Sequence, residues 1–154
     1  MAIRNSAKAI LIQNNSVFLN TCIDRAGETF YELPGGGQNQ FETTQQALVR
    51  ECLEGTGFRV RPIRLAAIGE EIYKDEILRT LYLDYSHKLF QIFVVELADE
   101  VRREPTELDN DQIDSGWIPI EQVPSLPLRP TCVREHFLEI LNSDAPIYFD
   151  TTYV

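Results

Sequence analysis

The stretch LPGGGQNQFETTQQALVRECLEGTGF, residues 33–58, decides the fold of this chain. Its three consecutive glycines, residues 35–37, follow an apolar segment, and glycine lets a backbone take positive φ values and approach a ligand closely. Thr43 and Thr44 offer hydroxyl caps to the helix formers that come after them. Gly57 is placed to end this helix in a left-handed conformation. The stretch therefore predicts a strand, a glycine bend with usable backbone oxygens, and a helix.

Two glutamates share one face of this predicted helix. At about 100° per residue, Glu51 and Glu54 point the same way, so their like charges repel unless a cation lies between them. Carboxylate and carbonyl oxygens are the ligands that Mg²⁺ prefers in proteins. A solvated acidic face, with Arg50 neutralising a neighbour, is the alternative interpretation. The glycine bend beside the helix favours a metal site.

The spacing of these residues resembles the Nudix box. Gly36, five residues, Glu42, seven residues and then the run 50–58 match eight of the nine defined positions of that motif. The resemblance implies an α/β (α+β) Nudix fold, in which a mixed β-sheet is sandwiched between α-helices, with residues 1–154 as a single domain. It also implies a hydrolase that uses Mg²⁺ or Mn²⁺ to cleave a pyrophosphate linkage. The implied substrate is a nucleoside diphosphate joined to another group, as in a nucleotide sugar, an ADP-ribose-like compound, a dinucleoside polyphosphate or a nucleoside triphosphate.

The same resemblance assigns the residues of the box to two groups. The metal ligands are Glu51 and Glu54, which also count as catalytic residues, together with the carbonyl of Gly35 or Gly36. The residues that give the box its structure are Gly36, Glu42, Arg50 and Gly57, with Glu42 and Arg50 as an ion pair between loop and helix.

One position departs from the box. Gly55 stands where the family has the second glutamate of a Glu-Glu pair, commonly a metal ligand. Glycine there removes a carboxylate and costs the helix about 1 kcal/mol relative to alanine. Either another acidic residue supplies the missing oxygen, or the protein is a catalytically weakened Nudix-like module that binds a nucleotide as a sensor.

An additional acid is expected from the polar stretch 99–115, whose composition indicates an exposed loop. Nudix enzymes often take a further metal ligand or general base from the loop before a strand that contains tryptophan, and here Trp117 opens such a strand. Asp111 is therefore the first choice as a metal ligand and catalytic residue, ahead of Asp114 and Glu107.

Aromatic side chains gather after the long strand predicted at 58–68, beyond a predicted bend at 69–71. Tyr73 lies near the distance from the box at which dinucleoside-polyphosphate hydrolases of the family often carry a tyrosine, so it is predicted to bind substrate. Tyr82 and Tyr85 can also stack on a base, and ordinary packing is the alternative for all three rings. Residues 74–86 are predicted to form a hairpin insert or a mobile loop over the site.

The remaining periodicity predicts a hairpin from 7–12 and 17–23, a central strand at 89–97 and an amphipathic helix at 132–142. The final segment, 145–154, is unusually apolar for a tail. We expect it to pack on its own domain or on a second subunit, which favours a homodimer.

Composition limits the function classes. The 154 residues, 44% hydrophobic and 25% charged, fit one globular domain. The net charge of −10 argues against a broad surface for duplex nucleic acid and is met at an anionic small-molecule site by a bound cation. No segment reaches the about 18 apolar residues of a membrane span, and the N-terminus lacks a signal-peptide core. With three widely spaced cysteines interpreted as reduced thiols, cytoplasmic residence is the expectation.

Overall fold

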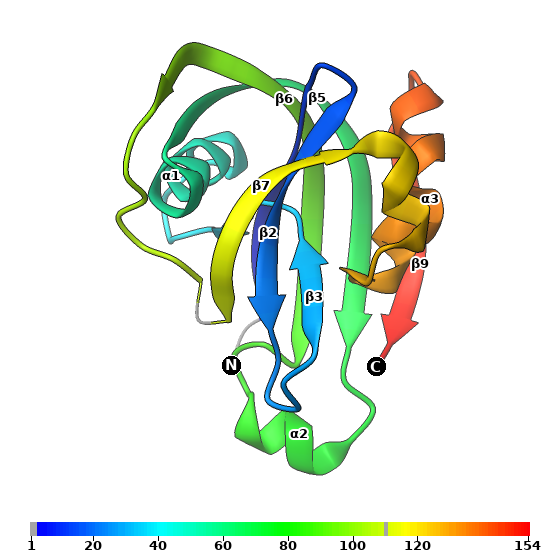
Figure 1. Ribbon diagram of the computed structural model, residues 1–154. Helices are drawn as coiled ribbons and strands as arrows, with labels where there is room; N and C mark the ends of the chain where they lie inside the picture. The colour runs from blue at the N-terminus through cyan, green and yellow to red at the C-terminus, as the bar shows by residue number, and fades with distance from the viewer. Residues whose placement is uncertain (1–2, 110) are drawn as a thin grey trace.

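The computed structural model describes residues 3–109 and 111–154. Within these residues, nine strands join in one mixed sheet of order β8-β3-β2-β1-β6-β5-β9, with β4 paired to β1 and β7 to β2 (Figure 1). In chain order the elements are β1 (Arg4–Gln13), β2 (Ser16–Ile23), β3 (Thr29–Glu32), β4 (Gly35–Gly37), α1 (Thr44–Thr56), β5 (Phe58–Ile72), α2 (Glu76–Leu81), β6 (His87–Arg102), β7 (Gln112–Pro119), the 3-10 helix η1 (Ile120–Ser125), β8 (Leu128–Arg129), α3 (Thr131–Asn142) and β9 (Ile147–Tyr153). None of the helices in the described ranges is both long enough and apolar enough to span a membrane.

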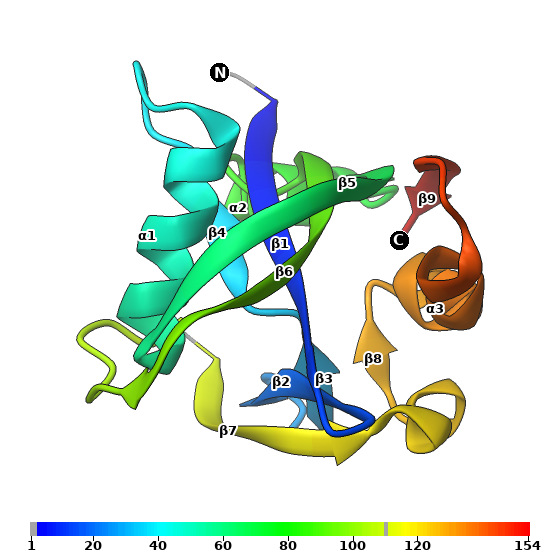
Figure 2. The same ribbon diagram turned by 90° about the horizontal axis from the view of Figure 1, so that it is seen from above.

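The two long helices lie on opposite sides of the sheet, as Figure 2 shows from above. The sheet strands β1 and β6 run parallel to each other at its centre and are buried on both faces. Alternation along β1 explains how: Ala9 and Leu11 pack in the core under α1, while Ile10 packs in the core under α3. The expected sandwich of a mixed sheet between helices is confirmed.

Most elements predicted from periodicity are present, and one bend is not. Residues 69–71 continue β5, where Gly69 pairs with Phe90 of β6. A Cβ atom on Gly69 would lie 2.4 Å from Cε2 of Phe90 and 3.0 Å from Cδ2 of Phe149. The glycine therefore makes room for two rings to pack over the strand instead of turning the chain, and the predicted bend is wrong.

Two further segments are more regular than their composition indicated. The polar stretch 99–115 is a loop only in its middle, because its first residues end β6 and its last residues begin β7. Segment 74–86 contains the short helix α2, capped by the Asp75 carboxylate, which accepts from the backbone N–H groups of Ile77 and Leu78. The apolar tail forms β9, which pairs in parallel with β5 and buries Phe149 in the domain's own core.

Candidate active site

Helix α1, which carries Glu51 and Glu54, is capped at both ends. Thr43 accepts a hydrogen bond from the Gln46 backbone N–H, and the Gln46 side chain accepts from the Thr43 backbone N–H, which forms a capping box. At the other end Gly57 has φ +79° and its N–H donates to the carbonyl of Leu53. Ala47, Leu48 and Cys52 face the core and set the rotation of α1. The acidic residues are thereby turned away from the core.

The glycine strand β4 brings the bend against β1 on one side and against α1 on the other. Gly35 has φ +131°, and a Cβ there would lie 2.1 Å from the Ala7 carbonyl oxygen, so only glycine fits. A Cβ on Gly36 would lie 2.3 Å from Oε2 of Glu51. The carboxylate of Glu51 therefore rests directly on the backbone of the bend.

The register of β4 decides which glycine oxygens face outward. Gly36 lies opposite Ala7. Two positions away on either side, the backbone N–H of Ala9 donates to the carbonyl of Pro34, and that of Gln38 donates to the carbonyl of Asn5. Because bonded pairs alternate along an antiparallel ladder, the Gly36 carbonyl points to Ala7. The neighbouring carbonyls point away from β1: that of Gly35 accepts from Lys8 Nζ at 3.5 Å, and that of Gly37 accepts from Arg50 Nη2 at 2.9 Å. Of the two carbonyls expected as a metal ligand, the register favours Gly35.

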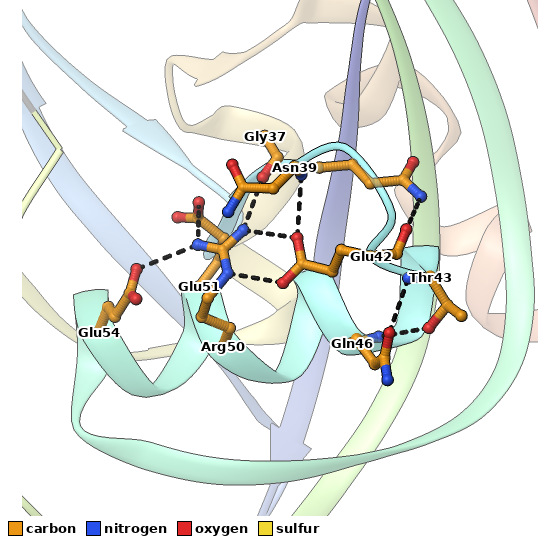
Figure 3. A network of polar contacts seen from close by, with 9 residues as sticks. Gly37, Asn39, Glu42, Thr43, Gln46, Arg50, Glu51 and Glu54 are labelled. Carbon is orange, nitrogen blue, oxygen red and sulfur yellow. Dashed lines mark hydrogen bonds and ion pairs between the residues drawn. The ribbon is translucent and has the colours of Figure 1, made fainter.

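Arg50 joins the three carboxylates of the box (Figure 3). Its Nε and Nη2 donate to Glu42 Oε1 and Oε2 at 2.7 and 2.8 Å, and its Nη1 donates to Glu51 Oε1 at 2.8 Å and Glu54 Oε2 at 3.2 Å. The hydrogen bonds from Arg50, and one from the Asn39 backbone N–H, lower the pKa of Glu42 to about 2. The same contact with Glu42 raises the pKa of Arg50 above its usual value. Loop and helix are thus held together by a bidentate ion pair, as the sequence predicted for Glu42 and Arg50.

Arg50 leaves part of the Glu51 and Glu54 carboxylates accessible. One oxygen of Glu51 and one of Glu54 contact Arg50, and their side chains keep 21% and 30% of their accessible surface. Three carboxylates around one guanidinium leave two negative charges in excess. Glu51 therefore lies on the glycine bend, and Glu54, the other predicted metal ligand, lies beside it on the same arginine.

The donor set fits a hard divalent cation. No group of three His, Cys, Asp or Glu side chains within 3–109 and 111–154 is arranged to hold a metal ion. Mg²⁺ does not need such a cage, because it is commonly bound through one or two carboxylates, with water and substrate phosphates completing its shell. Glu51, Glu54 and the Gly35 carbonyl supply oxygens of that kind, and the excess negative charge favours a cation there.

A second charged group, which the sequence reasoning missed, adjoins the bend. Lys8 of β1 lies 3.6 Å from Glu32 Oε2 of β3, and its Nζ contacts the Gly35 carbonyl. Burial lowers the pKa of Lys8, but the charges of Glu32, Asp109 and Glu51 outweigh this effect and raise it. The signal in the sequence was a lysine inside an otherwise apolar strand run, residues 7–12.

Asp109, in the loop between β6 and β7, interacts electrostatically with Glu51. The residue is exposed as a whole, but the protein atoms around its carboxylate raise its pKa, and repulsion from Glu32 and Glu51 adds to this while Lys8 opposes it. Gln112 fixes the loop here: its Oε1 accepts from the Asp109 backbone N–H and its Nε2 donates to the Gly55 carbonyl. The loop is therefore tied to the helix at the position where the box departs from the family pattern.

The structure gives Asp111 and Tyr73 other contacts. Asp111 is exposed, and its backbone carbonyl accepts from Ile23 at the end of β2. The Tyr73 ring packs edge-on against Tyr82 at 6.4 Å and lies 5.8 Å from Lys88 Nζ. Among the contacts of the described residues, none joins either side chain to Glu51 or Glu54. The roles predicted for Asp111 and Tyr73 stay predictions that no contact supports.

Gly36→Ala tests whether the glycine serves the site or the fold. We expect little loss of stability, within about 1 kcal/mol, because the new Cβ meets the end of a flexible side chain. Metal-dependent activity is expected to fall at least about tenfold, since the Glu51 carboxylate must leave the bend. Thermal unfolding and steady-state kinetics measure the two effects. Equal losses of stability and activity would show that Gly36 is needed only for folding.

The NUDIX domain family matches residues 1–138 of this chain. The protein belongs to the Nudix family, as the box indicated. It is 30% identical over 132 residues to the MutT4 protein of Mycobacterium tuberculosis (strain CDC 1551 / Oshkosh), covering 80% of this chain and 48% of that protein. The chain thus spans about half the length of that relative.

A second relative and a solved structure agree with this assignment. The RNA pyrophosphohydrolase of Haemophilus influenzae (strain PittEE) is 26% identical over 141 residues, covering 83% of this chain and 71% of the relative. A Nudix hydrolase from Nitrosomonas europaea superposes with a TM-score of 0.71 at 19% identity, covering 91% of this chain and 88% of that one. At that identity the superposition establishes the fold alone.

Proposed function

We propose that this protein hydrolyses a phosphoanhydride bond in a nucleoside diphosphate joined to another group, with a divalent cation as cofactor. The observation that carries the proposal is the position of the Glu51 carboxylate on Gly36 of the bend, with Glu54 beside it on the same arginine. Family membership and a relative named as an RNA pyrophosphohydrolase support the reaction class.

Mg²⁺, or Mn²⁺ in its place, is the proposed cofactor. Glu51, Glu54 and the Gly35 carbonyl would hold it. A bound divalent cation supplies neutralisation of the diphosphate charge and lowers the pKa of a coordinated water. The rest of the chemistry belongs to the side chains of the chain itself.

Each charged group of the site has a role in this proposal. Arg50 holds the carboxylates of Glu51 and Glu54 in place, and Glu54 would accept the proton of the attacking water. Lys8, an ammonium group on the Gly35 carbonyl, lies where it can contact a phosphate oxygen of the substrate. The phosphate-bearing leaving group departs as the water oxygen bonds to phosphorus.

We propose Asp109, and not Asp111, as the additional acid of the site. A Cβ on Gly55 would point toward the Glu107 carbonyl and Gln112 Oε1, at 3.8 and 3.9 Å, and Gln112 also holds the Asp109 backbone. The loop therefore lies beside the position of the missing glutamate and leaves room for a Cβ atom there. We infer that Asp109 supplies the oxygen that Gly55 lacks.

The substrate class is proposed to be a small nucleotide. The chain carries a net charge of −10, which opposes a long nucleic-acid contact. One relative is named for RNA as its substrate, so a 5′-triphosphorylated oligonucleotide belongs in the test. The other candidates are ADP-ribose, a UDP-sugar, a dinucleoside polyphosphate and oxidised nucleoside triphosphates.

Product analysis of this panel with Mg²⁺, and with chelator in its place, tests the function. Metal-dependent release of a phosphorylated product from at least one small nucleotide is the expected result. Tight binding of a nucleotide without metal-dependent product would instead favour the sensor, which the absence of a second glutamate at Gly55 motivates. A Gly55→Glu variant separates these cases further, because its Cβ has room: a rise in turnover by orders of magnitude would identify a weakened enzyme.

We also propose that the protein resides in the cytoplasm and forms a homodimer. Cys22, Cys52 and Cys132 are free and buried, and burial raises the pKa of the Cys52 thiol to about 12, so it is protonated and unreactive. Reduced, buried thiols agree with the proposed cytoplasmic residence. The homodimer rests on exposed aromatic residues of β9, Tyr148 and Tyr153, and gel filtration with light scattering measures it directly.

A further inference from the structure

A cavity of about 530 Å³ adjoins the glycine bend and has no role in the chemistry above. It lies between the start of β1, the loop from β4 to α1, and the end of the α2 segment, and its lining includes Arg4, Asn39, Phe41, Glu42, Asp84 and Tyr85. Pockets that bind small ligands have volumes of about 300–1,000 Å³. This cavity is therefore large enough for one nucleoside.

Phe41, which lines this cavity, has a strained backbone and an exposed side chain. Its φ is +67°, a left-handed value that an L side chain rarely adopts, and its side chain is 96% exposed. The other non-glycine residues with positive φ in the described ranges are Asn14 and Asn15, in the β1–β2 turn, where that residue type is well tolerated. A large apolar ring that is both strained and solvated gains no burial in the free protein. Such an outlier points to a function of the side chain.

Arg4 supplies a cationic group in the same cavity. Its guanidinium lies 4.6 Å from the centroid of the Tyr85 ring, and a Cβ on Gly37 would lie 2.7 Å from its Nη2. No carboxylate among the described side chains lies within 4.0 Å of it, although the chain carries 24 acidic residues. The charge of Arg4 acts on Asp109 and opposes the rise in the pKa of that carboxyl, but Arg4 makes no direct ion pair with a described residue, so its guanidinium beside the glycine strand keeps donors for a phosphate.

The cavity is continuous with the box through shared residues. Glu42 lines it, and the carboxylate of Glu42 binds Arg50, which in turn contacts Glu51 and Glu54 (Figure 3). Gly37 contacts both arginines, since its Cα faces Arg4 and its carbonyl accepts from Arg50. A ligand that reaches from the cavity to the bend therefore passes Arg4 before it arrives at the acidic face.

We propose that this cavity is the nucleobase subsite, in which Phe41 is a stacking surface and Arg4, held against the Tyr85 ring, contacts the phosphate next to the nucleoside. This inference rests on the proposed function and deepens it, because it requires an aromatic base on the substrate. A ring that is exposed in the free protein becomes buried against the base, and the strain at residue 41 is offset in the complex. Substrates that carry a diphosphate without a base lack this interaction.

The test is the affinity of Phe41 variants for non-hydrolysable probes with Mg²⁺, measured by calorimetry. The probes are α,β-methylene nucleoside diphosphates of adenine, guanine, cytosine and uracil, and base-free methylenediphosphonate. Phe41→Gly and Phe41→Asn, whose new residues tolerate positive φ, are expected to weaken binding of the preferred nucleotide about tenfold. Both leave the affinity for methylenediphosphonate unchanged. The melting temperature of Phe41→Gly is expected to rise by about 2–4 °C, because the backbone strain is relieved.

Matched variants and outcomes make the test decisive. Phe41→Trp keeps an aromatic ring and is expected to retain nucleotide affinity. Tyr148→Ala removes an exposed ring of β9 and is expected to leave the affinity for every probe unchanged, whatever its effect on the oligomeric state. The subsite is overturned if the wild type binds no nucleotide probe more tightly than methylenediphosphonate, or if Phe41→Gly binds all probes as the wild type does. Equal weakening for all probes would also overturn it, since that indicates a displaced loop. Hydrolysis that persists while the subsite fails leaves the proposed reaction standing, so the two failures are distinguishable.

Discussion

Glu54→Gln is expected to lower the turnover of metal-dependent hydrolysis at least about a hundredfold, with the fold intact. The amide keeps the shape of the side chain but loses the negative charge for a metal and the ability to accept a proton. The contact that it gives up with Arg50 is a single 3.2 Å ion pair whose carboxylate is 30% exposed. Pairs of this kind contribute about 0–1 kcal/mol to stability. Arg50 also keeps its stronger contacts with Glu42 and Glu51.

Steady-state kinetics with Mg²⁺ and thermal unfolding of the same sample measure the two quantities. Glu96→Gln is the matched control, because Glu96 also pairs with one arginine, Arg61, at 2.9 Å on an exposed part of the sheet. The control is expected to lose less than twofold in turnover. If Glu54→Gln stays within twofold of the wild type as well, the acidic face is structural and the proposed reaction loses its main support.

Gly57→Ala is expected to destabilise the protein by about 3–4 kcal/mol, which lowers the melting temperature by roughly 10 °C for a chain of this size. The residue ends α1 at φ +79°, and a Cβ there would lie 1.7 Å from the Arg103 carbonyl oxygen, which is backbone. Relief requires the 103–109 loop to move, and the hydrogen bond from the Arg103 N–H to the Gly57 carbonyl to break. Because that loop carries Asp109, activity is expected to fall with stability.

Gly55→Ala, two residues earlier at the same end of the helix, is the control, because it is expected to stabilise the protein. Its Cβ meets only ordinary contacts at 3.8 and 3.9 Å, and alanine favours a helix interior over glycine by about 1 kcal/mol. Chemical denaturation with a linear extrapolation compares the two variants. A loss at Gly57 no larger than about 1 kcal/mol would mean that the loop adapts readily and that the left-handed cap is not required.

Local rules in the sequence were sufficient for the box and its supports. Thr43 and Gly57 cap the helix as expected, since capping depends on residues a few positions apart. The ion pair between Glu42 and Arg50 formed as the resemblance to the Nudix box implied. Gly69 shows the limit of such rules: glycine favours a bend locally, but the rings of Phe90 and Phe149, distant in sequence, need the space above it.

The acid of the 99–115 loop that is proposed to join the site could not be chosen from the sequence, because that choice also depends on contacts between residues distant in the chain. Asp109 and Asp111 have nearly equivalent surroundings along the chain, and the choice between them depends on Gln112, which ties the loop to the carbonyl of Gly55. Lys8 reaches the bend only because β1 pairs with β4. The cavity lined by Phe41 and Tyr85 likewise joins two loops more than 40 residues apart.

The sequence by itself determined the family, the helix with its caps and the two glutamates on one face, because these follow from spacing along a single turn or motif. Tertiary structure alone decided that the Gly35 carbonyl points away from β1, that the charge of Glu51 acts on Asp109, and that Arg4 lies beside a cavity without a direct ion pair to any described residue. The physical reason is that strand register and loop packing set distances between residues far apart in the chain, and no local periodicity encodes those distances.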